Sequence, residues 1–368
     1  MSKIRSFIRK ETVLCIAFLA ALVSCFFVPP DKEYLSYCDV RTLALLFSLM
    51  AVVAEMRKAG AFDTLAHVLC ARSGSTRLLA LILVFLSFFA AMFITNDVSL
   101  LTFVPFSVTV LTLAGQQKYL IRVVVLQTAA ANLGSMLTPV GNPQNIFIQS
   151  HYSVSTADFL RITGPVWGAS LLLLGLLCLT VGKEPVRVSI GEKPVLQMKK
   201  LLLGAALFLV CLLTVLNVLP WFYMLGTVCV CLALFDRSTL KEADFFLLLT
   251  FVCFFVFSGN LARMEAVNRF LRGVLSGREY FVSLLSSQVI SNVPAALLLS
   301  SFTDNARALL LGVNVGGLGT PVASLASLIS LKLYARSENA STGKFLLDFT
   351  FINVLLLVLL SLLVLLLG

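Results

Sequence analysis

The sequence predicts an all-α polytopic membrane protein that is built as an inverted-repeat transporter. Of its 368 residues, 59% are hydrophobic and 12% are charged, and the mean hydropathy is +0.99. Soluble domains have about 45–50% apolar and about 25% charged residues, so a soluble enzyme, a disordered chain and a disulfide scaffold are excluded. The apolar runs are continuous and rich in leucine, unlike the alternating strands of a membrane β-barrel. Helices remain, because they satisfy their own backbone hydrogen bonds in lipid.

About nine full spans are predicted, because a helix needs about 20 mostly apolar residues to cross the hydrocarbon. The unbroken spans lie at residues 13–28, 40–56, 158–181, 200–219, 221–235, 243–259 and 344–367. Two further spans, 119–149 and 305–334, are interrupted midway by clusters of glycine and proline. Such residues break helices, and lipid tolerates a break only where protein or a water-filled cavity satisfies the freed backbone groups.

Two other segments, 76–114 and 279–302, each contain an apolar helix, a polar tip and a second apolar helix. The tips are Thr95-Asn96-Asp97 and Ser291-Asn292. Each segment is either a pair of full spans with its tip at the membrane surface or a re-entrant hairpin with its tip near the midplane. The distribution of loop charges favours two re-entrant helical hairpins, which we therefore leave out of the span count.

Loop charges also predict the orientation. The net charge is +10, from 28 Lys and Arg against 18 Asp and Glu, and cytoplasmic loops collect basic residues. A basic cluster precedes the first apolar run: Lys3, Arg5, Arg9 and Lys10. It predicts a cytoplasmic N-terminus and a retained first span, so the acidic loop 29–39 lies outside and the basic linker 182–199 inside. Segment 260–278 carries four arginines yet falls outside, which an amphipathic helix on the interface would explain.

The two halves of the chain share two motifs in the same order. Residues 132–140 (NLGSMLTPV) match 314–322 (NVGGLGTPV) at a constant offset of 182, and 94–98 (ITNDV) match 290–294 (ISNVP) at an offset of 196. In the predicted orientation the two broken helices run in opposite directions. Glycines that only let helices pack closely are the alternative interpretation. Inverted repeats with paired interrupted segments indicate a secondary transporter.

The repeats define the predicted domain organisation. The first inverted repeat occupies 1–181 and contains the hairpin 76–114 and the broken helix 119–149. A cytoplasmic linker, 182–199, joins it to the second repeat at 200–368, which contains the hairpin 279–302 and the broken helix 305–334.

Three strings resemble the ion transporter superfamily, which includes divalent anion/sodium symporters, citrate transporters and arsenite permeases. They are residues 95–105 (TNDVSLLTFVP), 141–145 (GNPQN) and 291–294 (SNVP). The resemblance implies two opposed re-entrant hairpins, a scaffold domain that forms a homodimer and a transport domain that moves like an elevator. In dicarboxylate members each tip carries Ser-Asn-Thr beside a sodium site, whereas Asp97 and Val293 stand at the third position here. An Asn-Asp tip is more similar to the arsenite-permease branch.

Hairpin tips and broken helices offer preformed dipoles to an ion. A half-helix N-terminus favours an anion, and unwound carbonyls favour a cation such as sodium. The predicted solute ligands are Thr95, Asn96, Asn142, Ser291, Asn292 and Thr320. The predicted cation-coupling residues are Asp97, Asn96, Thr138, Gly141, Asn145, Asn292, Gly316 and Gly319. Asp97 is the strongest single candidate, because an ionised carboxylate inside the membrane is costly and usually marks an ion or proton pathway.

We therefore expect a secondary active transporter of a small, anionic solute, an oxyanion or a carboxylate, coupled to Na⁺ or H⁺. The alternatives are a cation/proton antiporter that uses Asp97 and a passive arsenite-type channel. No nucleotide-binding loop, catalytic triad or metal-ligand spacing of the nine cysteines appears in the sequence. We accordingly expect no enzyme activity, no resident cofactor beyond a coupling Na⁺ and no nucleic-acid partner for this multi-pass protein of the plasma membrane.

Overall fold

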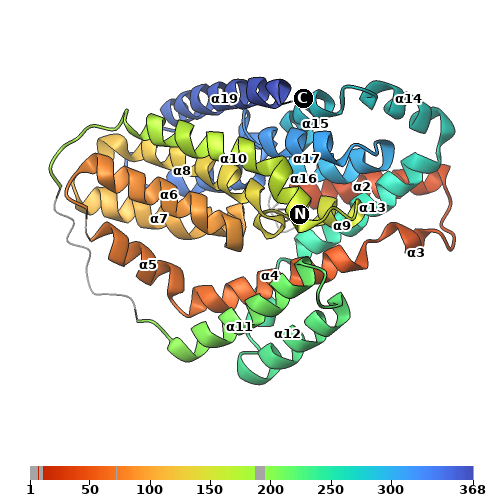
Figure 1. Ribbon diagram of the computed structural model, residues 1–368, viewed down its shortest axis with the longest axis horizontal. Coiled ribbons are helices and arrows are strands. Elements are labelled where there is room, and N and C mark those ends of the chain that lie inside the picture. The colour runs from red at the N-terminus through yellow and green to blue at the C-terminus, as the bar shows by residue number, and fades with distance from the viewer. Residues whose placement is uncertain (1–6, 8–10, 72, 187–194, 368) are drawn as a thin grey trace.

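The computed structural model of the protein describes Phe7 and residues 11–71, 73–186 and 195–367, and within these ranges it is all-helical apart from one isolated β-bridge. The helices of the first repeat are α2 (Thr12–Phe27), α3 (Tyr34–Tyr37), α4 (Val40–Lys58), α5 (Ala61–Cys70), α6 (Thr76–Ile94), α7 (Asn96–Leu113), α8 (Leu120–Gly134), α9 (Pro143–His151) and α10 (Thr156–Cys178). Those of the second are α11 (Met198–Val215), α12 (Trp221–Phe235), α13 (Phe245–Arg263), α14 (Glu265–Leu275), α15 (Glu279–Ile290), α16 (Asn292–Leu299), α17 (Ala306–Val315), α18 (Leu325–Tyr334) and α19 (Thr342–Leu366). The predicted all-helical polytopic fold is confirmed (Figure 1). The basic N-terminal cluster and residues 187–194 of the predicted linker lie outside the described residues.

Seven helices of the described chain are long and apolar enough to cross a membrane, and α6 and α7 are among them. In the second hairpin, α15 has 12 residues and α16 has eight. At a rise of about 1.5 Å per residue neither reaches across a hydrocarbon core of about 30 Å. Re-entry of both hairpins, and with it the count of nine spans, stays a prediction.

The two larger hydrophobic cores group the helices into two bodies, and a third, small core joins Val53 of α4 to Leu86 of α6 and Phe103 of α7. One core joins α6, α7, α8, α10, α15, α17, α18 and α19. The other joins α2, α4, α11, α12 and α13, and it also receives side chains from α9, α10, α16 and α17. In Figure 1 the first body includes α6–α8 at the left and α19 at the top, while α4, α11 and α12 lie along the lower edge. Helices α9, α16 and α17 therefore lie where the two bodies meet.

The two hairpin tips share one unusual backbone conformation. Thr95 ends α6 at φ 66° and ψ 152°, and Ser291 ends α15 at φ 73° and ψ 154°. Residues other than glycine rarely adopt positive φ, so the surrounding structure must hold both tips in place. The same strain at matched positions supports the repeat that the sequence predicts.

Two of the four arginines of segment 260–278, Arg263 and Arg272, lie within ion-pair distance of acidic side chains. Arg263 pairs with Asp31 at 2.7 Å and with Glu33 at 3.4 Å, both from the acidic 29–39 loop. Arg272 lies 3.8 Å from Asp304. The segment forms the amphipathic helix α14, as expected. Pairing with acidic residues at the same end of the molecule offers a physical reason why this segment departs from the charge rule.

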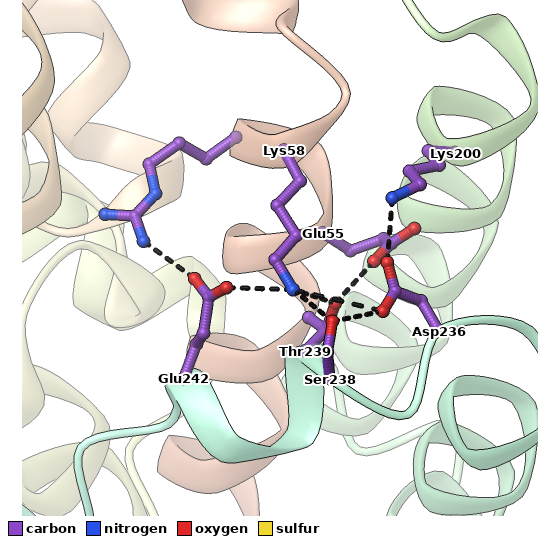
Figure 2. Close-up of polar contacts among 8 residues, drawn as sticks. Glu55, Lys58, Lys200, Asp236, Ser238, Thr239 and Glu242 are labelled. Atoms are coloured by element: carbon purple, nitrogen blue, oxygen red, sulfur yellow. Dashed lines mark hydrogen bonds and ion pairs between the residues drawn. The ribbon is translucent and has the colours of Figure 1, made fainter.

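A cluster of polar side chains stabilises the second body near the N-terminus of α13, at the other end of that helix from Arg263 (Figure 2). Asp236 follows α12 and accepts hydrogen bonds from Lys200 Nζ at 2.8 Å and from Ser238 Oγ at 2.5 Å. Lys58 Nζ donates to Ser238 Oγ at 2.8 Å and pairs with Glu242 at 2.8 Å. The cluster thus joins α4, α11 and the short turn after α12, and it fixes the segment that leads into α13.

The pH dependence of stability follows from this cluster. Hydrogen bonds from Lys200 and Ser238 hold the pKa of Asp236 well below its usual range. A carboxyl whose pKa is lowered on folding stabilises the fold above the unfolded pKa of about 3.9 and loses that contribution as the pH falls through the folded pKa. We expect Asp236→Asn to lower the free energy of unfolding at pH 7 by about 2 kcal/mol, and the difference from wild type to shrink below about pH 4.

Thermal unfolding in detergent between pH 3 and pH 7 measures this difference. Asp304→Asn is the control, because the side chain of Asp304 is 96% exposed and its ion pair spans 3.8 Å. Exposed pairs contribute little. A difference between Asp236→Asn and wild type that stays constant across this pH range would contradict the assignment.

Candidate functional site

Both hairpin tips line one cavity of about 340 Å³. Asn96 and Asp97 come from the first tip, and Ser291 and Asn292 from the second. A neighbouring cavity of about 370 Å³ shares Asp97 with it and adds Thr95. The two tips belong to opposite halves of the chain and nevertheless meet at one place, as the repeat predicts.

Four helices of the hairpins and broken helices begin at this cavity, each with its N-terminus. α7 begins at Asn96, α9 at Pro143, α16 at Asn292 and α18 at Leu325, and each of these residues lines the cavity. Each N-terminus carries unpaired backbone N–H groups and about half a positive charge. The convergence of four of them makes this side of the cavity attractive to an anion.

The side of the cavity formed by the second body is acidic. Glu11 and Asp244 are the N-cap residues of α2 and α13, and both line the cavity. Their carboxylates offset the positive ends of their own helices. The basic side chains along the two cavities are Arg57 and Lys332, and Arg57 is bound to Glu242 at 2.9 Å.

Asp97 is the acidic residue that the tips themselves contribute. Its backbone N–H donates to Asn96 Oδ1 at 2.9 Å. Among the described residues its carboxylate forms no ion pair and accepts no hydrogen bond from a side chain. Asp97 lies in the first turn of α7, where a negative charge interacts favourably with the positive end of the helix dipole. It is thus placed to bind a cation or a proton without first breaking a salt bridge.

The two tip asparagines differ in their contacts. The amide Nδ2 of Asn96 donates to Asn132 Oδ1 at 2.9 Å. The side chain of Asn292 forms no hydrogen bond within the described part of the chain, and the hydroxyl of neighbouring Ser291 reaches Ala323 O only at 3.4 Å. Both asparagines are 4% exposed. The amide of the first tip is therefore held by the protein, whereas the amide of the second has no partner among the described residues.

The two broken helices are joined by hydrogen bonds that obey the repeat symmetry. Asn132 of α8 accepts from Ser324 Oγ at 3.0 Å and donates to Ser327 Oγ at 3.2 Å. Its counterpart Asn314 of α17 accepts from Asn142 Nδ2 at 3.4 Å and donates to Asn145 Oδ1 at 2.8 Å. The offset of 182 residues between the two broken helices relates every member of one set to a member of the other. Each broken helix thus braces the break in its partner.

The threonines of the two breaks tie them to the hairpins in the same symmetric manner. Thr138 donates its hydroxyl hydrogen to Met92 O, and Thr320 donates to Gln288 O at 3.2 Å. Met92 and Gln288 are related by the offset of 196 residues that relates the two hairpin tips. The breaks are therefore fixed against the ends of α6 and α15, just before the tips.

The predicted site residues fall into two groups. The residues that line the two cavities are Thr95, Asn96, Asp97, Ser291 and Asn292. The residues that hold the breaks together or lie within them are Thr138, Gly141, Asn142, Asn145, Gly316, Gly319 and Thr320. Roles of either group as solute or cation ligands stay predictions. The threonine and asparagine side chains of the second group bind other parts of the protein.

The sequence interpretation passed over Asn132 and Asn314, which hold the centre of the site together. The signal was present, because these asparagines open the two strings that match between the halves of the chain. It also passed over Gln144, which lines the cavity.

Loss of Asn132 should destabilise the fold. Asn132→Ala leaves Asn96, Ser324 and Ser327 without their partner, and we expect the free energy of unfolding to fall by about 2 kcal/mol or more. Asn353→Ala is the control, because the amide of Asn353 is equally buried but donates only to Phe349 O in its own helix. Thermal unfolding in detergent compares them, and equal losses in both variants would contradict the bracing role.

Comparisons with known proteins agree with this architecture. A family model described as "Citrate transporter" matches residues 4–307. The inner membrane protein YbiR of Escherichia coli is 33% identical over 315 residues, which cover 84% of this chain and 84% of the relative. An uncharacterized transporter of Methanocaldococcus jannaschii is 32% identical over 318 residues, 86% of each chain. The silicon efflux transporter LSI3 of Oryza sativa subsp. japonica is 34% identical over 169 residues, 44% of this chain and 34% of the relative. Together with the repeated broken helices and the seven helices long enough to span a membrane, these matches show that the chain is a multi-pass membrane transporter of the citrate transporter family.

Proposed function

We propose that the protein is a secondary active transporter that moves a small anionic solute, an oxyanion or a carboxylate, across the plasma membrane. The convergence of four helix N-termini on the cavity between the hairpin tips carries this proposal. Backbone N–H groups at helix N-termini bind anions without a dedicated basic side chain. The free amide of Asn292 adds a donor at the same place.

Asp97 offers a means of coupling the solute to a proton or to Na⁺. The four N-termini together present a positive potential, and an ionised Asp97 offsets part of it. Protonation of Asp97, or Na⁺ bound to its carboxylate, restores the potential that attracts an anion. Solute and coupling cation then favour each other's binding, which is the condition for symport.

The two hydrophobic cores support an elevator motion. Helices α6, α7 and α8 pack in the first core, α9 and α16 pack in the second, and α17 contributes to both. Glu11 and Asp244 face the tips from the second body. A site placed where two hydrophobic cores meet changes its exposure when one body slides along the other. The second body would form the static part and the contact surface of a homodimer.

Two other functions draw on particular observations. The carboxylates of Glu11, Asp97 and Asp244 around one cavity favour a cation/proton antiporter of the same fold. The relative named as a silicon efflux transporter favours a small oxygen-rich solute in place of a carboxylate. If that solute crosses uncharged and without coupling, the protein is a passive channel.

Transport by the purified full chain in proteoliposomes separates these functions. We expect citrate or phosphate, which are anions at neutral pH, to accumulate when an inward Na⁺ or proton gradient is imposed, and accumulation to cease when ionophores collapse that gradient. Silicic acid, which is uncharged at neutral pH, serves as the third probe. Solute flux that is indifferent to both gradients would show a passive channel and contradict secondary active transport. Exchange of a cation for protons with no movement of any of the three solutes would show the antiporter instead.

A further inference from the structure

Gln144 breaks the symmetry of the two repeats. The offset between the broken helices relates it to Ala326, whereas the neighbouring Asn142 and Asn145 correspond to Ser324 and Ser327, which also carry hydrogen-bonding groups. The neighbours are all used in the bracing between the broken helices. Gln144 takes no part in these hydrogen bonds between the broken helices. The symmetric arrangement of the repeats therefore gives no structural reason for an amide at this position.

The amide of Gln144 is buried and unpartnered at the cavity. Gln144 lines the cavity between the tips and is 1% exposed. Its Nε2 has no hydrogen-bond partner, and no hydrogen bond of its side chain occurs within the described residues. A buried amide is costly to leave unsatisfied, and in native proteins such groups nearly always have a partner. The missing partner must therefore come from what fills the cavity.

The position of Gln144 indicates the chemistry of that partner. Gln144 is the second residue of α9, a helix of nine residues that begins with Pro143. Proline has no N–H group, so the N–H of Gln144 is the first donor that this helix N-terminus presents. A backbone donor and a side-chain donor on one residue match a solute oxygen that carries negative charge.

We propose that Gln144 is a solute ligand, whose side-chain amide donates a hydrogen bond to an oxygen of the anion held between the hairpin tips. This inference rests on the proposed function, because it takes the cavity as the solute site. It assigns the first repeat a specific ligand that the second repeat lacks. The solute is therefore bound asymmetrically, with the Gln144 amide on one side and the Asn292 amide on the other.

Two substitutions test this assignment, and Gln149→Leu is the control. Gln144→Leu keeps the size of the side chain but removes the donor. Gln144→Glu keeps its shape and replaces the donor with a carboxylate that repels an anion. Gln149 lies on the same helix and is 4% exposed, but it donates to Thr156 Oγ1 at 3.1 Å and does not line the cavity.

The probes are citrate, phosphate and silicic acid, and the readouts are the thermal shift of the purified protein and the KM of uptake. For whichever probe the wild type transports, we expect Gln144→Leu to raise KM about tenfold. For the anionic probes, citrate and phosphate, Gln144→Glu should raise KM further, and KM should recover as the pH is lowered and the new carboxyl is protonated. Gln149→Leu should leave KM unchanged. A purely structural amide would not produce the pH-dependent recovery.

The outcomes separate this inference from the proposed function. If Gln144→Leu and Gln144→Glu both transport with wild-type KM while Asn292→Ala does not transport, the inference is overturned and the proposed function stands. If the wild type neither binds nor moves any of the three probes, both are overturned together. If Gln144→Leu unfolds, the isosteric Gln144→Glu variant still decides through its pH dependence.

Discussion

Gly134→Ala should largely abolish folding, because it places a methyl group where the backbone of another helix already lies. A Cβ atom at Gly134 would lie 2.0 Å from Phe88 O and 2.8 Å from Phe88 Cα. Backbone cannot move aside as a flexible side chain can, so α8 would have to separate from α6. We expect a loss of about 3 kcal/mol or more in the free energy of unfolding, seen as loss of monodisperse protein in detergent.

The second repeat offers a matched variant and α10 offers a control. A Cβ atom at Gly316, the counterpart of Gly134, would lie 2.9 Å from Leu284 Cα, and Leu284 is the counterpart of Phe88. Gly316→Ala should therefore fail in the same way. Gly164→Ala should be tolerated or mildly stabilising, because no atom lies within 4 Å of its new methyl group and alanine favours a helix. Normal folding of Gly134→Ala would show that the close approach of α8 to α6 is wrong.

Asp97→Asn should uncouple transport without destroying the site. The substitution removes the charge and the titrating group but keeps a polar side chain of the same size in the first turn of α7. We expect gradient-driven accumulation of the solute to fall at least about tenfold, while exchange of solute across the membrane at equal concentrations continues. Uptake and exchange are measured in the same proteoliposomes, with Na⁺ and proton gradients imposed separately.

Asp39→Asn is the control for this charge change. Asp39 caps α4, where it accepts from Thr42 N at 3.0 Å, and asparagine caps a helix equally well. It does not line the cavities between the tips. Loss of both accumulation and exchange in Asp97→Asn would favour the cation/proton antiporter. Unchanged accumulation would remove Asp97 from the coupling mechanism.

Much of the architecture could be predicted from the sequence because it is encoded in local patterns. The hairpin predicted at 279–302 matches α15 to the turn after α16, and the one at 76–114 matches α6 and α7 to within a residue. The breaks fall where proline and glycine stop the helices. The correspondence of the two halves is supported by the tips, where Thr95 and Ser291 share one strained conformation.

The contacts of the site could not be predicted in the same way. Whether an asparagine faces the cavity or the other broken helix depends on how α8 and α17 cross, which segments from opposite halves of the chain determine together. The repeat strings show that Asn132 and Asn314 correspond, but they do not show that each binds the break of the other. Equally, nothing local distinguishes Gln144, whose amide is free, from Asn145, whose amide donates to Ser135 O and Thr138 O.

The central claim is that the solute is bound between the two hairpin tips, and uptake by Asn292→Ala tests it most directly. The amide of Asn292 lines the cavity and binds no other described residue, so its loss should remove solute binding while leaving the fold intact. Asn353→Ala removes an equally buried amide in α19 that lies away from the cavity. We predict that gradient-driven uptake of the transported probe falls to background in Asn292→Ala and stays at the wild-type rate in Asn353→Ala. Wild-type uptake by a folded Asn292→Ala variant would contradict the claim.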